Sequence, residues 1–169
     1  TSQIAAIEAA DVPALTSAQL VALTTDQARA LTTDQIAALT TGQIEQMEAA
    51  DVAALNTAQI VALSTAQVAA LTTAQVAALT TAQVAALETA DLRAITPTYI
   101  PSLTTAQIQA LSLVQVAALT TAQVRALETA DLVALKPDQV EVLTAAQVGA
   151  LTSEQVAALT TTQLQALGS

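Results

Sequence analysis

TTAQVAAL occupies residues 72–79 and recurs immediately in residues 80–87. Traced outward in both directions, the period of eight residues never slips between Glu8 and Leu167, so this region consists of twenty octads without an insertion. A fixed short period of this kind is the mark of a repeat array, in which neighbouring units bury each other's apolar faces. Positions one to eight of the octad are counted from the first Thr of TTAQVAAL.

Two positions of the octad are apolar almost throughout. Position eight is Leu except at Met47 and Ile95, and position five is Val, Ile or Leu except at Ala28. Residues three apart share one face of a helix. Each octad therefore predicts a small helix with a single Val/Leu face.

The opening residues of the octad are a helix start signal. Position one is Thr, Ser or Asn in fifteen of the twenty octads, and Gln follows three residues later in fourteen of those. This is a capping box, in which the hydroxyl or amide oxygen accepts from the third helical amide while Gln reaches back to the cap amide. We predict that every octad begins a new helix.

Two other architectures compete with this interpretation. In one continuous helix, each octad would advance about 80° beyond two full turns, so the apolar stripe would wind around the helix and no single partner could bury it. A β-solenoid would need alternating apolar residues, whereas the spacing here is three and then five, and Ala and Gln are poor strand residues. Helices this short are unstable alone, which favours an all-α solenoid in which neighbours cover the Val/Leu faces.

The prolines fit this prediction unequally. Pro97 and Pro137 directly follow the cap position, where the missing N–H costs nothing. Pro13 and Pro101 stand at position six, where an α-helix needs an N–H for its bond to residue i−4. We therefore expect those two octads to be distorted, or the helices to be shorter than a full octad allows.

A second period is superimposed on the octad. Four acidic octads open with Glu and carry Asp at position four, and they are 40 residues, or five octads, apart. The pairs are Glu8/Asp11, Glu48/Asp51, Glu88/Asp91 and Glu128/Asp131. They divide the single repeat domain, residues 1–169, into predicted super-repeats at residues 8–47, 48–87, 88–127 and 128–167.

The longer period suggests a superhelix with about five octads per turn. Five octads of roughly 10 Å each would close a ring with a radius near 8 Å, which Val and Leu could fill, and turns would stack about 8–10 Å apart. The acidic octads would then form a column. The alternative is that a 40-residue unit was duplicated regardless of the superhelical geometry.

Composition limits the function. The chain has no Cys or His, one Lys and a net charge of -10. The usual nucleophile–base pairings are missing, so an enzyme is the least expected class, and no catalytic, cofactor-binding or metal residue is assigned. The acidic balance argues against nucleic acid and against anionic membranes as partners, and no apolar run approaches the length of a membrane helix.

The acidic pairs are the one patterned polar feature. A row of cation sites is one interpretation, because hard cations take carboxylate oxygens. The simpler interpretation is that acidic side chains favour helix N-termini through the helix dipole. The doubled threonines raise ice binding as a further alternative. Tyr99, which replaces the box Gln within TPTYIPSL (residues 96–103), indicates either a contact site or a locally repacked octad, and the latter is favoured.

Two resemblances bear on identity. The string L-T-x-x-Q-V-x-x-L at Leu71–Leu79 resembles the opening helix of TAL-effector repeats, but the 34-residue period, base-reading loop and basic stripe of that family are missing, so DNA binding is not carried over. Nearly the whole chain resembles the TTxQVAAL arrays of large bacterial surface or secreted proteins. That resemblance implies an extracellular or cell-surface setting and says little about activity.

These observations favour a non-catalytic structural module, a spacer, stalk or scaffold, over a module that binds protein, cations or ice on one face. The chain begins inside a repeat at Thr1, and Gly168-Ser169 replace the expected Thr-Thr. We therefore expect an excerpt of a longer protein, with residues 168–169 left by cloning. Untrimmed terminal octads would expose Val/Leu faces, which predicts end-to-end self-association.

Overall fold

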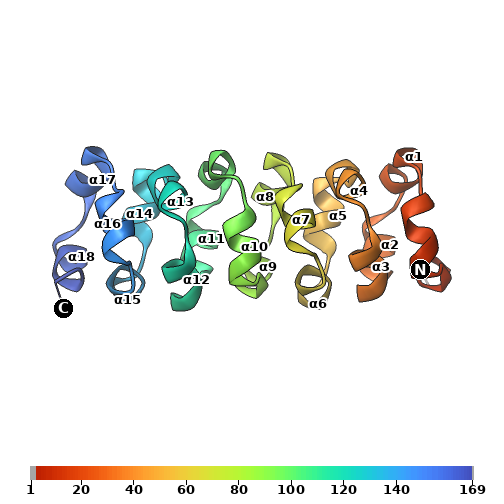
Figure 1. Ribbon diagram of the computed structural model, residues 1–169, viewed down its shortest axis with the longest axis horizontal. Helices are drawn as coiled ribbons and strands as arrows, with labels where there is room; N and C mark the ends of the chain where they lie inside the picture. Colours follow the sequence, from red (N-terminus) through yellow and green to blue (C-terminus); the bar gives the residue numbers. More distant parts are fainter. Residues whose placement is uncertain (1–2, 169) are drawn as a thin grey trace.

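The computed structural model describes residues 3–168, so Ser169 of the predicted cloning scar lies outside the described residues. Within that range the chain forms only short helices, each five or six residues long except for a three-residue 3₁₀ helix near the N-terminus. They follow one another in a superhelical rod with the two ends of the chain at its opposite ends (Figure 1). The prediction of an all-α solenoid with one short helix per octad is confirmed.

The helices fall one to an octad, in strict order. The α-helices are α1 (Ser17–Val21), α2 (Thr25–Ala30), α3 (Thr33–Ala38), α4 (Thr41–Gln46), α5 (Ala49–Ala54), α6 (Thr57–Val61), α7 (Thr65–Ala69), α8 (Thr73–Ala78), α9 (Thr81–Ala86), α10 (Thr89–Ala94), α11 (Thr105–Ala110), α12 (Leu113–Ala118), α13 (Thr121–Ala126), α14 (Thr129–Ala134), α15 (Pro137–Glu141), α16 (Ala145–Gly149), α17 (Ser153–Ala158) and α18 (Thr161–Ala166). The 3₁₀ helices are η1 (Ile4–Ala6), η2 (Ala9–Ala14) and η3 (Pro97–Ser102).

Capping boxes start the helices as predicted. At α9, the Thr80 hydroxyl accepts from the amide of Gln83, and the Gln83 side-chain oxygen accepts from the amide of Thr80 at 2.7 Å. All fourteen octads with a Thr, Ser or Asn cap and a following Gln form the complete box. The Lys136 side chain has no acceptor atom, so only half of the capping box forms at α15. The Gln139 side-chain oxygen accepts from the Lys136 amide, while the Asp138 carboxylate accepts from the Gln139 amide.

Most helices, α8 among them, end in a corner made of extended backbone. Leu79 has φ −54° and ψ 136°, and the next cap, Thr80, has φ −73° and ψ 158°. Two consecutive extended residues redirect the chain before the next box restarts the helix. Because the same pair of residue types recurs every eight residues, the same corner recurs, and equal corners generate a regular superhelix.

The prolines at position six account for two exceptions to α geometry. The octads of Pro13 and Pro101 are the 3₁₀ helices η2 and η3. Proline lacks the N–H that the α-helical bond to residue i−4 requires, and the observed bonds run instead over three residues, as from the Tyr99 amide to the Thr96 carbonyl at 2.8 Å. The predicted distortion is confirmed.

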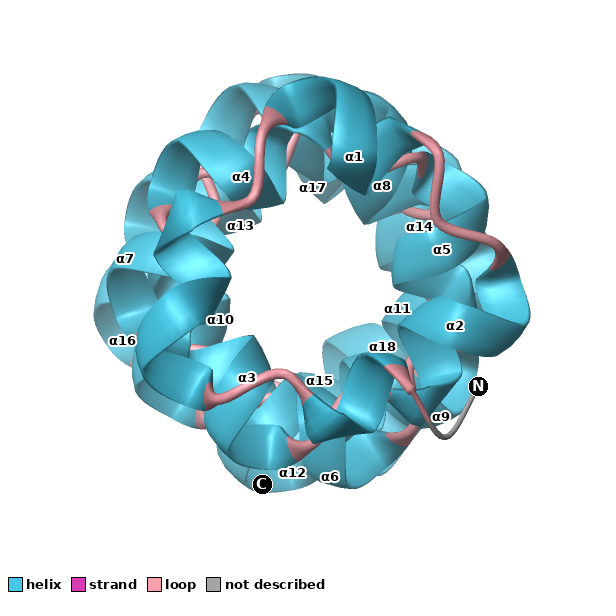
Figure 2. Ribbon diagram, turned by 90° about the vertical axis from the view of Figure 1, so that its right-hand side faces the viewer, coloured by secondary structure: helices cyan, strands magenta, loops and turns pink. Residues whose placement is uncertain are grey.

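Most apolar residues of positions five and eight are buried and form one continuous core. Val76 is 0% and Leu79 4% exposed, and the buried cluster extends from Val12 to Leu159. Figure 2, which looks along the rod, shows the helices as a ring around the axis. Within residues 3–168, no helix is long and apolar enough to cross a membrane.

The predicted five octads per turn is wrong. Helices three octads apart pack against each other, as α5 does with α8 and α7 with α10. Hydrogen bonds between turns reach four octads back, over 28 and 31 residues. A turn therefore holds more than three and fewer than four octads. The estimate of five assumed that each octad contributes its full length to the perimeter, whereas the sharper corners close a narrower ring that two apolar side chains per octad can fill.

Candidate functional site

The position-four glutamine has a second function beyond capping. The side-chain nitrogen of Gln83, Nε2, donates to the carbonyl oxygens of Val52 at 2.8 Å and Leu55 at 2.7 Å, in the turn below. These carbonyls lie at the C-terminal end of α5, where helical carbonyls lack partners within their own helix. The side-chain oxygen of Gln83 thus caps its own helix, and the side-chain nitrogen donates to carbonyls at the end of another helix.

This arrangement recurs along the rod. Twelve glutamines donate to carbonyls 31 and 28 residues earlier, and Gln139 donates to those of Gln109 and Leu111 instead. We call these thirteen the inter-turn glutamines: Gln35, Gln43, Gln59, Gln67, Gln75, Gln83, Gln107, Gln115, Gln123, Gln139, Gln147, Gln155 and Gln163. All thirteen are buried.

Sequence reasoning missed this function, although a signal was present. A capping box accepts Glu as readily as Gln. Position four nevertheless holds Gln in fifteen octads and Glu in none. Only the amide supplies N–H donors in addition to the acceptor, so the absence of Glu indicated that a donor was needed.

The acidic octads have Asp in place of Gln at position four, so the series of inter-turn glutamines is interrupted there. Asp51, Asp91 and Asp131 are 2%, 4% and 3% exposed, so they occupy the same buried place as the glutamines. A carboxylate has no proton to donate, and it accepts instead: the Thr65 hydroxyl donates to Asp91 at 2.7 Å and the Thr105 hydroxyl donates to Asp131 at 2.8 Å. At the octads of Asp91 and Asp131, the turns are therefore joined through a threonine side chain in place of backbone carbonyls.

Asp51 is the least satisfied of these carboxylates. Its Oδ2 is buried and has no hydrogen-bond partner among the described residues. Burial, together with the nearby Glu48 carboxylate, raises the pKa of Asp51 above its usual value. The charged form of this side chain therefore opposes folding.

The glutamates of the acidic octads do not cap their helices with their side chains. Glu8, Glu48, Glu88 and Glu128 are exposed, and none accepts a cap hydrogen bond. Side-chain capping therefore does not explain these glutamates. The aspartates lie in the first turn of their helices, as the helix-dipole interpretation expects. Asp91 and Asp131 also accept from the neighbouring turn, whereas Asp11 is exposed.

The predicted column of acidic pairs is also wrong. Five octads make more than one turn and fewer than two, so successive acidic octads lie on different sides of the rod. In Figure 2, α5 and α14 lie on the right and α10 lies on the left. The described residues contain no group of three acidic, His or Cys side chains placed to hold a metal ion.

Tyr99 stands in a repacked octad. It takes position four of the octad 96–103, it is partly buried against the core, and the following Ile100 is 1% exposed. The Ser102 hydroxyl donates to the Tyr99 carbonyl at 2.6 Å, which closes the 3₁₀ segment locally. The favoured interpretation, local repacking, accounts for this segment.

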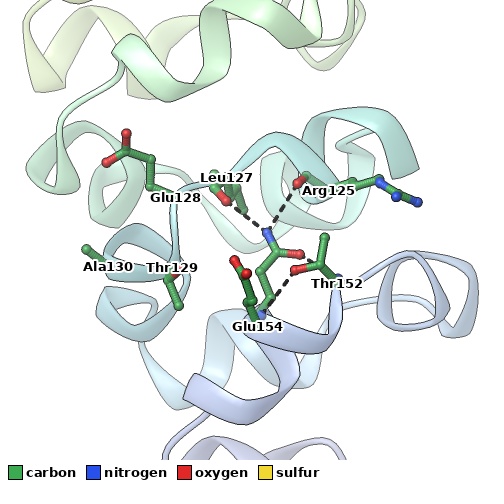
Figure 3. Close-up of a pocket in the computed structure, with 8 residues that line it drawn as sticks. Arg125, Leu127, Glu128, Thr129, Ala130, Thr152 and Glu154 are labelled. Atoms are coloured by element: carbon green, nitrogen blue, oxygen red, sulfur yellow. Dashed lines mark hydrogen bonds between the residues drawn. The ribbon is translucent and has the colours of Figure 1, made fainter.

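An open depression of about 450 Å³ lies between α13–α14 and α17 (Figure 3). It is lined by Arg125, Leu127, Glu128, Thr129, Ala130, Thr152, Glu154 and Gln155. Its one buried amide, Gln155, is already bonded to the carbonyls of Arg125 and Leu127. The Arg125 and Glu128 side chains point away from it in Figure 3, so the lining presents no converging set of polar groups.

The few basic side chains are dispersed along the chain. Arg29 lies 3.8 Å from Asp26 in an exposed pair on one helix, and its Nε donates to the carbonyl of Ala54 in the next turn at 3.4 Å. Exposed pairs of this kind contribute little to stability. Arg93, Arg125 and Lys136 stand in other octads.

The comparison with protein families found one match. A family model described as the ALTTAQ repeat matches residues 4–41, 44–81, 84–121 and 124–161. The matches recur every 40 residues and begin four residues before the predicted super-repeats, whose boundaries stay a prediction. No curated protein matched the chain.

Proposed function

Because the chain belongs to the ALTTAQ repeat family, we propose that it is a structural repeat module, a spacer, stalk or scaffold within a longer bacterial protein. The observation that carries this proposal is the use of polar groups. The side-chain amides of the thirteen inter-turn glutamines are buried and donate to carbonyls of the preceding turn, so none of them is directed at a ligand. Regular hydrogen bonds between successive turns suit a rigid spacer of constant length.

The exposed positions support the same function. Position six holds Arg29, Ala37, Glu45, Ala53 and Val61 in successive octads, which differ in size, polarity and charge. A face that recognised a partner through every turn would repeat its chemistry along the rod. Because a turn does not contain a whole number of octads, even a regular octad pattern would be spread around the circumference.

A spacer must keep its length, and small-angle X-ray scattering tests this property. We expect the curve of a stiff rod, and we expect deletion of residues 88–127 to shorten the longest dimension by about 10–15 Å. This estimate takes five octads as more than one turn, with turns about 8–10 Å apart. Deletion of four residues, 88–91, is the control, because it breaks the octad register and should disrupt the rod.

A hinged or collapsed scattering profile for the intact chain would contradict the proposed function. So would an unchanged longest dimension after the 40-residue deletion. Binding of a small ligand or an ice surface by a well-formed rod would favour the binding alternative, and an ice recrystallisation assay on the same sample measures the latter.

A further inference from the structure

We propose that the rod has one weak seam in its middle, between the octads of α6 and α7 and those of α10 and η3, at which adjacent turns separate first. The rod is closed at rest, and it opens at this seam before any other when tension or denaturant acts on it. This goes beyond a spacer of constant length, because it assigns the place where the spacer gives way.

The seam lies where two successive octads lack an inter-turn glutamine. Position four is Asp91 in the α10 octad and Tyr99 in the η3 octad. A carboxylate has no proton to donate, and the Tyr99 side chain makes no hydrogen bond among residues 3–168. The glutamines on either side, Gln83 and Gln107, both reach the turn below. The glutamine bonds between turns are therefore missing at two neighbouring octads.

The other buried aspartates are single interruptions. Asp51 and Asp131 each have an inter-turn glutamine in the octad directly before and in the octad directly after their own. These four glutamines are Gln43, Gln59, Gln123 and Gln139. Between α3 and α18, the octads of Asp91 and Tyr99 are the one consecutive pair without such a glutamine.

The carbonyls that correspond to these two positions lack glutamine donors. The interior spacing of 31 and 28 residues assigns two carbonyls to each octad, namely those of Ile60, Leu63, Val68 and Leu71. Among the described residues, the Leu63 and Leu71 carbonyls accept no hydrogen bond, whereas the other two accept from amides of their own octads. In place of the glutamine bonds, the structure has one side-chain bond, from the Thr65 hydroxyl to Asp91 at 2.7 Å.

Apolar packing holds the rest of the seam. α7 packs against α10, α8 packs against η3, and Tyr99 is partly buried against the core. Because a turn holds fewer than four octads, two octads cover more than half of its circumference. More than half of this contact between turns is thus held by apolar packing and a single side-chain hydrogen bond. Figure 1 shows α7 beside α10 in the middle of the rod.

The weakest contact between turns determines where a solenoid opens. Its stability is a sum of terms for single units and for contacts between neighbours, so local opening occurs where the contact term is smallest. Tension along the rod, which a spacer between two parts of a longer protein experiences, would therefore separate the turns here first. That consequence rests on the proposed function, whereas the seam itself does not.

Thiol labelling tests the proposal on the intact chain, since the sequence has no Cys and one introduced thiol is unique. Val68→Cys places the thiol at the seam. Val124→Cys places it at the same octad position in α13, where the Val124 carbonyl accepts from Gln155. The two valines are 1% and 0% exposed, so a reagent reaches either thiol only when turns open.

We expect the Val68→Cys thiol to react with an aromatic disulfide reagent about tenfold faster than the Val124→Cys thiol, because each net hydrogen bond changes an opening equilibrium several-fold. Val124 lies nearer to an end of the chain than Val68 does, so fraying of the ends would give the opposite order. The urea midpoint of each chain, measured by circular dichroism, corrects the rates for global unfolding.

Closing the seam is the second arm of the test. Asp91→Gln with Tyr99→Gln supplies a donor at both positions and should reduce the ratio of the two labelling rates to about one. Asp51→Gln is the matched control, because it makes the same exchange of Asp for Gln at a single interruption. It should leave the ratio unchanged.

Equal labelling rates in the otherwise unaltered chain, or a ratio that the seam-closing pair leaves unchanged, would overturn the proposal. So would an equal fall of the ratio with Asp51→Gln, because opening would then not be local to the seam. A stiff rod in small-angle scattering that shows equal labelling rates would keep the spacer function and reject the seam alone.

Discussion

The side-chain nitrogen of Gln83 lies 2.7 Å from the carbonyl oxygen of Leu55, a residue 28 positions earlier in the chain. This bond, repeated by the other inter-turn glutamines, joins each turn of the rod to the one before. It also gives the Leu55 carbonyl, beyond the end of α5, a partner, whereas the Val52 carbonyl accepts both from Gln83 and from the Leu55 amide. Turn-to-turn stability thus depends on a polar residue that the octad places beside its apolar core.

Replacing Gln83 with Glu should therefore be costly. The carboxylate keeps the capping box but cannot donate, so the carbonyls of Val52 and Leu55 lose the glutamine donor, and a charge is buried against them. We expect a loss of about 2–4 kcal/mol in the free energy of unfolding, measured by urea denaturation. Gln27→Glu is the control, since that amide makes no inter-turn bond, and it should change stability by less than about 0.5 kcal/mol. Equal effects at both positions would contradict the inter-turn function.

Asp91→Gln should restore a missing bond. A glutamine at this position would lie 31 and 28 residues after Ile60 and Leu63, the spacing of the interior bonds, and it would remove a buried carboxylate. We expect a gain of about 1 kcal/mol in the free energy of unfolding. The Thr65 hydroxyl loses its acceptor, so Thr65→Ala in the same background shows how much that loss offsets the gain. A destabilised Asp91→Gln chain would show that the Thr65–Asp91 hydrogen bond is worth more than the bond that replaces it.

Because the pKa of Asp51 is raised in the folded chain, the contribution of this carboxyl group to stability decreases as pH rises. The folded chain binds this proton more tightly than the unfolded chain, so the contribution of Asp51 is most favourable at low pH and is lost as pH rises through its folded pKa. We expect Asp51→Asn to stabilise the chain above that pKa and to have little effect below pH 3.8. Melting temperatures of both chains across the acidic range measure the difference. A gap between the two chains that widens as pH falls would contradict this sign.

Proline at position six determines the helix type of its octad. Pro101→Ala supplies an N–H that can donate to the carbonyl of residue 97, so η3 should convert to an α-helix. Carbon-13 chemical shifts of residues 97–102 report the change. Pro97→Ala is the control, because proline costs nothing at the first helical position, and it should leave η3 as it is. An unchanged η3 in the Pro101→Ala chain would show that Tyr99 alone imposes the 3₁₀ geometry.

Much of the local structure could be predicted from single octads. The boxes at residues such as Thr80 and Gln83 locate the helix starts, because capping is an interaction over three residues. The spacing of Val76 and Leu79 identifies the inward face, and Pro13 and Pro101 identify the two distorted octads. Each of these features depends only on neighbours within one octad.

The interactions over 28 and 31 residues could not be predicted in this way. The partner of Gln83 depends on the number of octads in a turn, and that number depends on the corner angle at pairs such as Leu79-Thr80. Many extended dihedral angles are compatible with those two residues. The same uncertainty made the acidic octads look like a column, because a 40-residue sequence period was equated with a turn.

Interactions within a single octad are enough to specify the repeating unit: a capped short helix with a Val/Leu face, repeated every eight residues, whose faces must be buried by other copies of the unit. The stacking of these units, by contrast, depends on contacts between turns. Corner geometry and packing set the turn at between three and four octads, and this places glutamine nitrogens against carbonyls four octads away and Asp51 in a buried site. The reason is that capping and periodicity act within a few residues, whereas the superhelical pitch accumulates from small backbone angles that no single residue type specifies.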